Sequence, residues 1–225
     1  MNITNSSSAF DRLNQKITGC TKCKRLAGYT REVARVKVKR FSKENYWGKP
    51  VPAFGDPDAK VLIIGLAPAA HGANRTGRMF TGDSSGDWLY RALYETGFAN
   101  QPESTNANDG LQLKDVLISA TIRCAPPQNK PKPDEIRNCN EYLHEEIGLL
   151  PNLKVVLVLG KIAFDTYRKM KNLKGIQFLH HAIYPFDSQT LICSYHPSRQ
   201  NTQTGRLKWD DWLSVFKNIR DLIDS

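Results

Sequence analysis

Four short apolar runs constrain the fold of this chain more than any other feature. They are rich in β-branched residues and occupy residues 61–66, 116–122, 155–159 and 191–195. A strand that is apolar on both faces is typical of a parallel sheet covered by helices on both sides. The runs therefore predict four parallel strands that are joined by helical crossovers.

Helical patterns follow the strands at residues 84–97, 136–150, 162–170 and 209–223. Their apolar residues recur at intervals of three and four, which predicts helices with one buried face. Strands alternating with helices favour a three-layer α/β/α architecture around a central four-stranded parallel sheet. We expect one domain over residues 1–225, with residues 9–59 forming a cysteine-bearing N-terminal extension packed on it.

Charge and composition narrow the class of protein. The chain has 225 residues, of which 32 are Lys or Arg and 22 are Asp or Glu, giving a net charge of +10. An excess of this size indicates either a polyanionic partner, nucleic acid above all, or only a solvated basic surface, and charge alone does not separate the two. The polar N-terminus has no signal-peptide pattern, and the apolar runs are far shorter than the roughly 20 residues that span a bilayer. We expect a soluble, monomeric, cytoplasmic protein with no membrane contact, nucleoid-associated if prokaryotic.

Polar loops follow three of the four predicted strands. The first loop lies in KVLIIGLAPAAHGANRTGRMFTGD, residues 60–83, and we expect it to present polar side chains and one aromatic ring: His71, Asn74, Arg75, Arg78, Phe80 and Asp83. The second strand ends in RCAPPQNKPKP and the fourth in SYHPSRQNTQTGRL. Ligands of open α/β sheets bind where parallel strands end. His71, Asn129 and His196 should therefore converge on one edge.

These loops carry a specific resemblance. The segments GLAPAAHGANRTGRMFTGDSSG, RCAPPQNKP and YHPSRQNTQTGRL resemble, in order and in detail, the motifs of the family 5 (type B) uracil-DNA glycosylases. The match runs from about Cys20 to Leu207. It implies the glycosylase fold and an enzyme that flips deaminated bases out of duplex DNA. Hydrolysis of the N-glycosidic bond by water would then leave an abasic site, without a catalytic lysine.

The resemblance assigns roles around the base. Phe80 would stack on it, although a phenylalanine before a turn can equally be a core residue. His196 would donate a hydrogen bond to the departing base, on the logic of an oxyanion hole. Asn129 would read the base edge or orient water, whereas outside the family it would be read as a turn residue. Arg78 and Gly82 lie close to Phe80 in the sequence, and these basic and glycine neighbours favour an exposed ring.

Water activation is less evident from the motifs. Leu66 stands where related families hold a polar catalytic group, and the resemblance makes this leucine typical of family 5. Asp83 is the nearest acidic residue and is equally suited to cap the helix that begins near residue 84. The rest of the predicted base-binding pocket comprises Ala67, Pro68 and His71. Together with Ala69 and Ala70, the small Ala67 leaves room for a purine, which predicts activity on hypoxanthine as well as uracil.

Two basic or polar segments are candidates for DNA contact. The loop Ser198, Arg199 and Gln200 would press into the minor groove and fill the space left by the flipped base. Lys24 and Arg25 follow the first cysteine pair and would lie near the DNA. The alternative for the loop is a solvated polar turn. A contact with a replication clamp leaves no readable signal.

Four of the five cysteines have a spacing that suggests a metal site: Cys20, Cys23, Cys124 and Cys139. Four thiolates suit tetrahedral zinc or an iron–sulfur cluster, and only the first pair is close in sequence. The resemblance implies a [4Fe–4S] cluster with a structural role. The fifth, Cys193, lies in an apolar strand and is expected to be a buried small hydrophobe.

Two other functions compete with the glycosylase. The first is a non-catalytic iron–sulfur or zinc protein that binds nucleic acid through its basic surface. Such a module has no need for a stacking ring and a lone histidine at one sheet edge. The second is a phosphate-binding enzyme that uses the 65–72 loop, which is weaker because no GxxxxGK[ST] motif is present.

Overall fold

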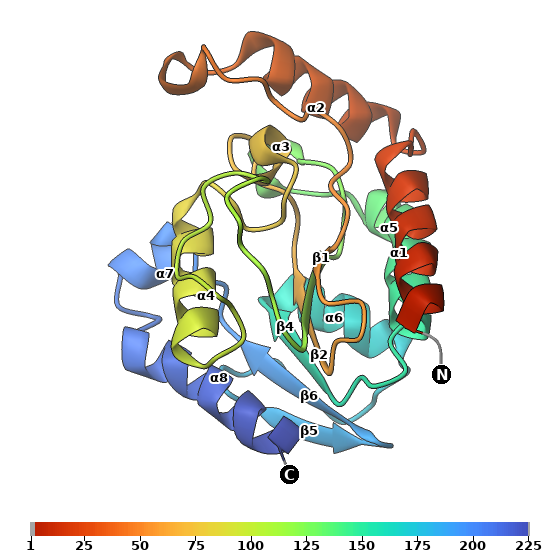
Figure 1. Ribbon diagram of the computed structural model, residues 1–225, viewed down its shortest axis with the longest axis vertical. Coiled ribbons are helices and arrows are strands. Elements are labelled where there is room, and N and C mark those ends of the chain that lie inside the picture. Colours follow the sequence, from red (N-terminus) through yellow and green to blue (C-terminus); the bar gives the residue numbers. More distant parts are fainter. Residues whose placement is uncertain (1–2, 225) are drawn as a thin grey trace.

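The computed structural model describes residues 3–224 and contains one six-stranded sheet (Figure 1). Its strand order is β1-β3-β2-β4-β6-β5. The strands are β1 (Phe54–Gly55), β2 (Val61–Gly65), β3 (Val116–Ala120), β4 (Val155–Leu159), β5 (Ile183–Phe186) and β6 (Gln189–Ser194). The inner strands β3, β2, β4 and β6 run parallel, and in their register Ile63 lies between Ile118 and Leu157.

The expected sheet of four strands was incomplete. All four predicted runs are present, and an antiparallel strand is added at each edge: β1 beside β3, and β5 beside β6. Strand β1 has only two residues and lies in a Gly- and Pro-rich segment, so it carries no periodicity. Strand β5 alternates exposed and half-buried residues. It contains Pro185, and proline within a sheet is found mainly on edge strands because it has no backbone N–H to donate.

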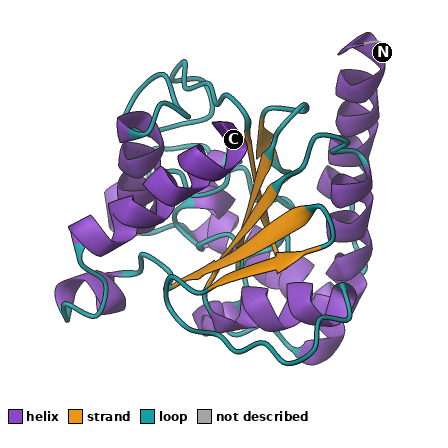
Figure 2. Cartoon of the chain, turned by 90° about the horizontal axis from the view of Figure 1, so that it is seen from below, coloured by secondary structure: helices purple, strands orange, loops and turns teal. Residues whose placement is uncertain are grey.

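Helices cover both faces of the sheet (Figure 2). On one face α4 (Ser84–Glu95) contacts α8 (Trp209–Asp224), and on the other α5 (Pro133–Gly148) contacts α6 (Lys161–Met170). The side chains of β2 alternate between these layers: Val61 and Ile63 pack with α4 and α8, and Leu62 and Ile64 with α5 and α6. The sheet therefore has two apolar cores, which explains why its strands are apolar throughout.

The N-terminal segment joins the sheet through a third core. It comprises α1 (Ile3–Thr18), α2 (Lys24–Val36) and the short η1 (Lys39–Phe41), and Figure 1 shows α1 beside α5 and α2 above α3 (Ala73–Thr76). The third core holds Leu13, Ile17, Leu26 and Tyr142 together with cysteines.

A buried ion pair fixes the loop that follows β3. Behind the end of β3, Arg123 and Glu146 form a pair whose side chains are 1% and 0% exposed, with Nη2 and Oε2 2.5 Å apart. Ser119 Oγ donates to the same carboxylate at 2.7 Å. Breaking such a buried pair is costly, because either charge left alone has no solvent. This pair anchors the segment that leads into η2 (Pro127–Asn129).

No helix within residues 3–224 is long and apolar enough to cross a membrane.

Candidate active site

A pocket of about 490 Å³ opens where β2, β3 and β6 end. The loops after these three strands and the start of α4 line it. The lining residues are Leu66, Ala67, Ala69, Ala73, Met79, Phe80, Asp83, Ser84, Ser85, Asn129, His196, Ser198, Arg199 and Gln200. The loops predicted to converge on this edge therefore do so, and the predicted residues Phe80, Asn129 and His196 share one cavity.

Phe80 lines the pocket from the loop after β2. Its ring lies against the end of β2, where a Cβ atom built on Gly65 would come within 2.8 Å of the ring. The backbone of Phe80 is left-handed, with φ of 53°. For a phenylalanine this conformation costs ~1–3 kcal/mol and persists only where surrounding contacts hold it. Phe80 is half-buried and lines the pocket, so the exposure that the sequence favoured is partial.

His196 stacks on Phe80. The two ring centroids are 5.6 Å apart and the planes are inclined by 26°. Burial lowers the pKa of His196 to about 4, so its imidazole is neutral at physiological pH. The loop is held from behind by Asn201, whose amide donates to the carbonyl of His196 at 2.8 Å. Asn201 lies in the quoted HPSRQN segment, although its role could not be read from the sequence.

Asn129 reaches the pocket from the loop after β3. It ends η2, and both Gln128 and Asn129 are left-handed, with φ of 55° and 56°. Asparagine tolerates this conformation better than most residues, so the turn by itself suits an asparagine at this position. The turn places Asn129 on both the base-sized pocket and the groove beside it.

Asp83 caps helix α4 and also lines the pocket. Its Oδ1 accepts hydrogen bonds from the backbone of Ser85 and Gly86 at 3.0 and 3.1 Å. Its Oδ2 lies against Gly72, where a Cβ atom would overlap it. Burial raises the pKa of Asp83, although the two backbone donors act in the opposite direction. Of the two roles that the sequence left as alternatives, the structure shows the helix cap, and it also places Asp83 on the pocket lining.

Of the four remaining predicted pocket residues, two line the pocket and two do not. Leu66 and Ala67 line the pocket. Pro68 is buried and lies outside the lining, and His71 lines the neighbouring groove instead. There His71 Nδ1 is 3.1 Å from the hydroxyl of Tyr46, a contact between residues 25 apart that no motif indicated.

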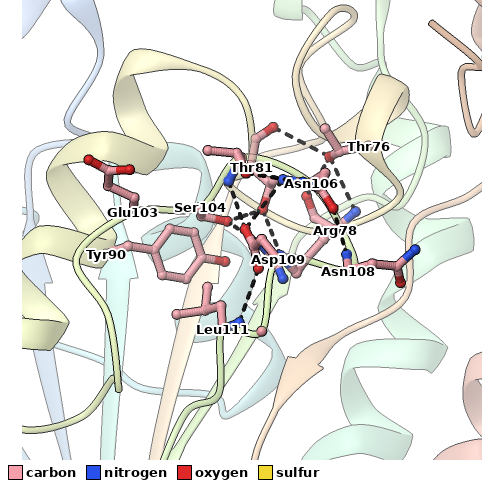
Figure 3. Close-up of polar contacts among 12 residues, drawn as sticks. Thr76, Arg78, Thr81, Tyr90, Glu103, Ser104, Asn106, Asn108, Asp109 and Leu111 are labelled. Atoms are coloured by element: carbon pink, nitrogen blue, oxygen red, sulfur yellow. Dashed lines mark hydrogen bonds and ion pairs between the residues drawn. The ribbon is translucent and has the colours of Figure 1, made fainter.

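Three polar residues of the first loop are buried, contrary to the expectation that they point into the site. Asn74 donates to the carbonyls of Thr30 and Ala70, and the Arg75 guanidinium pairs with Glu44. Arg78 is 4% exposed and pairs with Asp109 in the network of Figure 3. Sequence position alone could not separate these residues from pocket residues, because their partners lie in distant segments.

The predicted DNA-contacting residues have unequal freedom. Arg199 and Gln200 are exposed at the pocket rim, and Ser198 caps α7 (Arg199–Gln203) through a bond from Asn201 N. Lys24 is exposed at the start of α2. Arg25 instead forms a two-pronged ion pair with Glu135, at 2.8 and 2.6 Å, which ties α2 to α5. The structure gives Arg25 a bracing role.

The four cysteines with metal-site spacing belong to one core cluster. Cys124 and Cys139 are buried and Cys20 and Cys23 half-buried. Burial raises the pKa of Cys124 to about 12, and the other three thiols add to the shift. Within residues 3–224 no group of three or more His, Cys, Asp or Glu side chains is arranged to hold a metal ion. Cys193 is fully buried in the sheet core, as expected.

The lowered pKa of His196 predicts how the stability of the fold depends on pH. Because the pKa of His196 is lower in the folded chain than the ordinary value of about 6.5, the neutral ring stabilises the fold above pH 6.5. This contribution is lost as the pH falls toward 4. Nitrogen NMR of labelled histidine should show His196 titrating near pH 4, and Phe80→Ala should raise its pKa by admitting water. A native His196 that titrates near 6.5 would contradict the buried stack.

Comparison with known proteins gives one consistent result. The model of the Uracil DNA glycosylase superfamily matches residues 52–219. The type-5 uracil-DNA glycosylase of Thermus thermophilus is 46% identical over 211 residues, covering 92% of this chain and 95% of that protein. Those of Mycobacterium tuberculosis and Pyrobaculum aerophilum are 42% and 39% identical, covering 98% and 92% of this chain and 84% and 91% of their own. The chain therefore belongs to the uracil-DNA glycosylase superfamily and is a monofunctional glycosylase of its type-5 family.

Proposed function

We propose that the protein flips uracil, and also hypoxanthine, out of duplex DNA into the pocket and hydrolyses the N-glycosidic bond. The observation that carries the proposal is the stack of Phe80 and neutral His196 inside a cavity at the strand ends. A flipped base needs a flat apolar surface and donors for its edge. Phe80 supplies the surface, and His196 and Asn129 supply polar groups on the surrounding walls.

Stabilisation of the leaving base follows from the neutral state of His196. As the glycosidic bond breaks, negative charge builds on the base. A neutral imidazole can donate one N–H to that charge, and in a half-buried site this bond is stronger than in water. The pocket thus favours the transition state through a fixed donor, and His196 does not have to gain or lose a proton.

Water activation is assigned to Asp83. Its Oδ1 is occupied by the helix cap, while the carboxylate lines the pocket. We infer that the other oxygen orients the attacking water. Its raised pKa makes the carboxylate a better base than a solvated one. A dissociative cleavage needs only modest help of this kind.

Room for a purine comes from small side chains. Ala67, Ala69 and Ala73 line the pocket where larger residues would narrow it. The volume of about 490 Å³ lies within the range of small-molecule sites, roughly 300–1,000 Å³, and does not restrict the site to a single pyrimidine ring. Hypoxanthine carries a carbonyl and a ring N–H as uracil does, so the same polar groups can read both bases.

DNA contact is proposed for the pocket rim. Arg199 and Gln200 are exposed beside the cavity, and Ser198 lines it. In this position the loop can fill the gap left by a flipped base. Lys24 adds a free cation to the surface near the cysteine cluster.

We also propose that the four clustered cysteines hold a [4Fe–4S] cluster. The thiols come from three separate segments and pack in one core, which suits a group that braces α2 against α5. A single zinc ion requires all four sulfurs at about 2.3 Å, whereas a four-iron cube holds them farther apart. Zinc ribbons usually have two cysteine pairs that are close in sequence, whereas only Cys20 and Cys23 are close here, and this spacing favours the cluster. When bound, the cluster would supply structural cross-linking.

The base-excision proposal predicts alkali-labile strand breaks in duplexes that carry one uracil or one hypoxanthine. His196→Ala should lower the single-turnover rate by ~100-fold or more, since one missing donor to a developing anion costs about that much. Its affinity for the duplex should stay within about threefold of wild type. Intact hypoxanthine duplex after prolonged incubation would exclude the purine activity, and near-normal cleavage by the variant would exclude the role of His196.

Asp83 is tested with two substitutions. Asp83→Asn keeps an acceptor for the helix cap and removes the charge, so we expect an unchanged melting temperature and a rate lowered by ~10-fold or more. Asp83→Ala removes both, and loss of the cap should cost an additional ~1 kcal/mol of stability. An Asp83→Asn enzyme with the wild-type rate would leave the cap as the residue's main role.

The metal proposal is tested on protein purified without oxygen. We expect brown protein with about four irons per chain and broad visible absorption, and loss of both in Cys124→Ala. Cys193→Ala is the matched control, because this cysteine is buried in another core and should leave the iron content unchanged. Colourless protein with one zinc per chain would overturn the assignment.

A further inference from the structure

We propose that Arg78 and Asp109 act together as a clamp that positions Phe80 for base stacking, a role that rests on the proposed function. The Arg78–Asp109 clamp comprises these two residues with Thr81 and Ser104 (Figure 3). None of the four lines the base pocket. Their effect on the reaction must therefore pass through the backbone on either side of Phe80.

Asp109 lies in the loop between α4 and β3, and its carboxylate accepts hydrogen bonds from several residues of that loop. Its Oδ2 accepts from the Arg78 guanidinium at 2.5 Å and from the backbone of Thr105 at 2.8 Å and Asn106 at 3.3 Å. Its Oδ1 accepts from Leu111 N at 3.0 Å. Burial alone would raise the pKa of Asp109, but Arg78 and the backbone donors hold it below its ordinary range. The carboxylate is therefore charged throughout the working pH range.

Arg78 connects the Asp109 carboxylate to the segment that carries Phe80. Its Nε donates to Thr81 Oγ1 at 3.0 Å, and its Nη2 donates to Ser104 Oγ at 2.7 Å. Thr81 Oγ1 and Ser104 Oγ are themselves 2.6 Å apart. The guanidinium also lies 4.9 Å from the centroid of the Phe54 ring on β1. A buried charge with this many partners has one geometry available to it.

The backbone around Phe80 is held from both sides. The carbonyl of Met79 accepts from Tyr90 Oη at 2.7 Å, and Gly82 N donates to the carbonyl of Ser104 at 3.2 Å. Phe80 itself has the unfavourable φ of 53°. Without the clamp this residue would relax toward an ordinary conformation and its ring would leave the end of β2. The clamp thus keeps the stacking surface ready before a base arrives.

A double-mutant cycle tests the clamp. Asp109→Asn removes the charge that holds Arg78, Phe80→Ala removes the ring, and the third variant carries both. In single-turnover excision of uracil we expect Asp109→Asn to lower the rate by about tenfold, equal to ~1.4 kcal/mol. In the Phe80→Ala background the same change should lower it less than about twofold, because the ring is already gone. Glu103→Gln, an exposed charge in the same loop, is the control and should keep the wild-type rate.

A second readout needs no DNA. NMR titration of His196 should give a higher pKa in Asp109→Asn than in wild type, because the displaced ring no longer excludes water. Equal rate losses in the two backgrounds with an unmoved His196 pKa would overturn the clamp. A Phe80→Ala enzyme with the full rate would instead overturn the proposed stacking role. If Asp109→Asn does not fold, Arg78→Lys, which keeps the charge and loses the fork, replaces it in the same cycle.

Discussion

The contact between the Phe80 ring and the bare backbone at Gly65 sets the geometry of the whole pocket. Any side chain at Gly65 would meet the ring, so the end of β2 can receive it only at a glycine. The ring in turn supports His196, which arrives from β6. Two strands that are separated in the sheet by β4 are thus joined above it by one aromatic stack. The sheet therefore holds both rings of the site in fixed positions.

Three arginines of this basic chain pair with acidic residues inside the protein, so their charge is not available to a polyanionic partner. Arg75, Arg78 and Arg123 are buried and pair with Glu44, Asp109 and Glu146. Each pair is neutral as a unit, so the net charge of +10 belongs to other residues. Buried pairs add little net stability, because desolvation offsets their attraction. Their value here is geometric, since each one fixes a loop that leaves the carboxyl edge of the sheet.

The sequence was most informative where one physical pattern dominates. Continuous apolar runs identified every inner strand, and helical periodicity identified α4, α5, α6 and α8. Edge strands β1 and β5 were missed, because a two-residue strand and a proline-containing one carry too few buried residues to form a pattern. Convergence at the sheet edge was predictable from parallel strands. The burial of Arg78 was not, because its partner Asp109 lies 31 residues away in a loop without periodicity.

The removal of water affects both Phe80 and His196. The same burial that lets Phe80 offer an apolar surface also lowers the pKa of His196, so in the proposed mechanism the histidine is a neutral donor when the base departs. A protonated ring would attract the anion more strongly, but in a half-buried site its charge would cost more to maintain without a base present. A neutral donor in a fixed position avoids this cost and is worth most when charge develops. In the proposed mechanism the leaving base is stabilised in this way and Asp83 needs only to orient water, which is compatible with one of its oxygens serving as a helix cap.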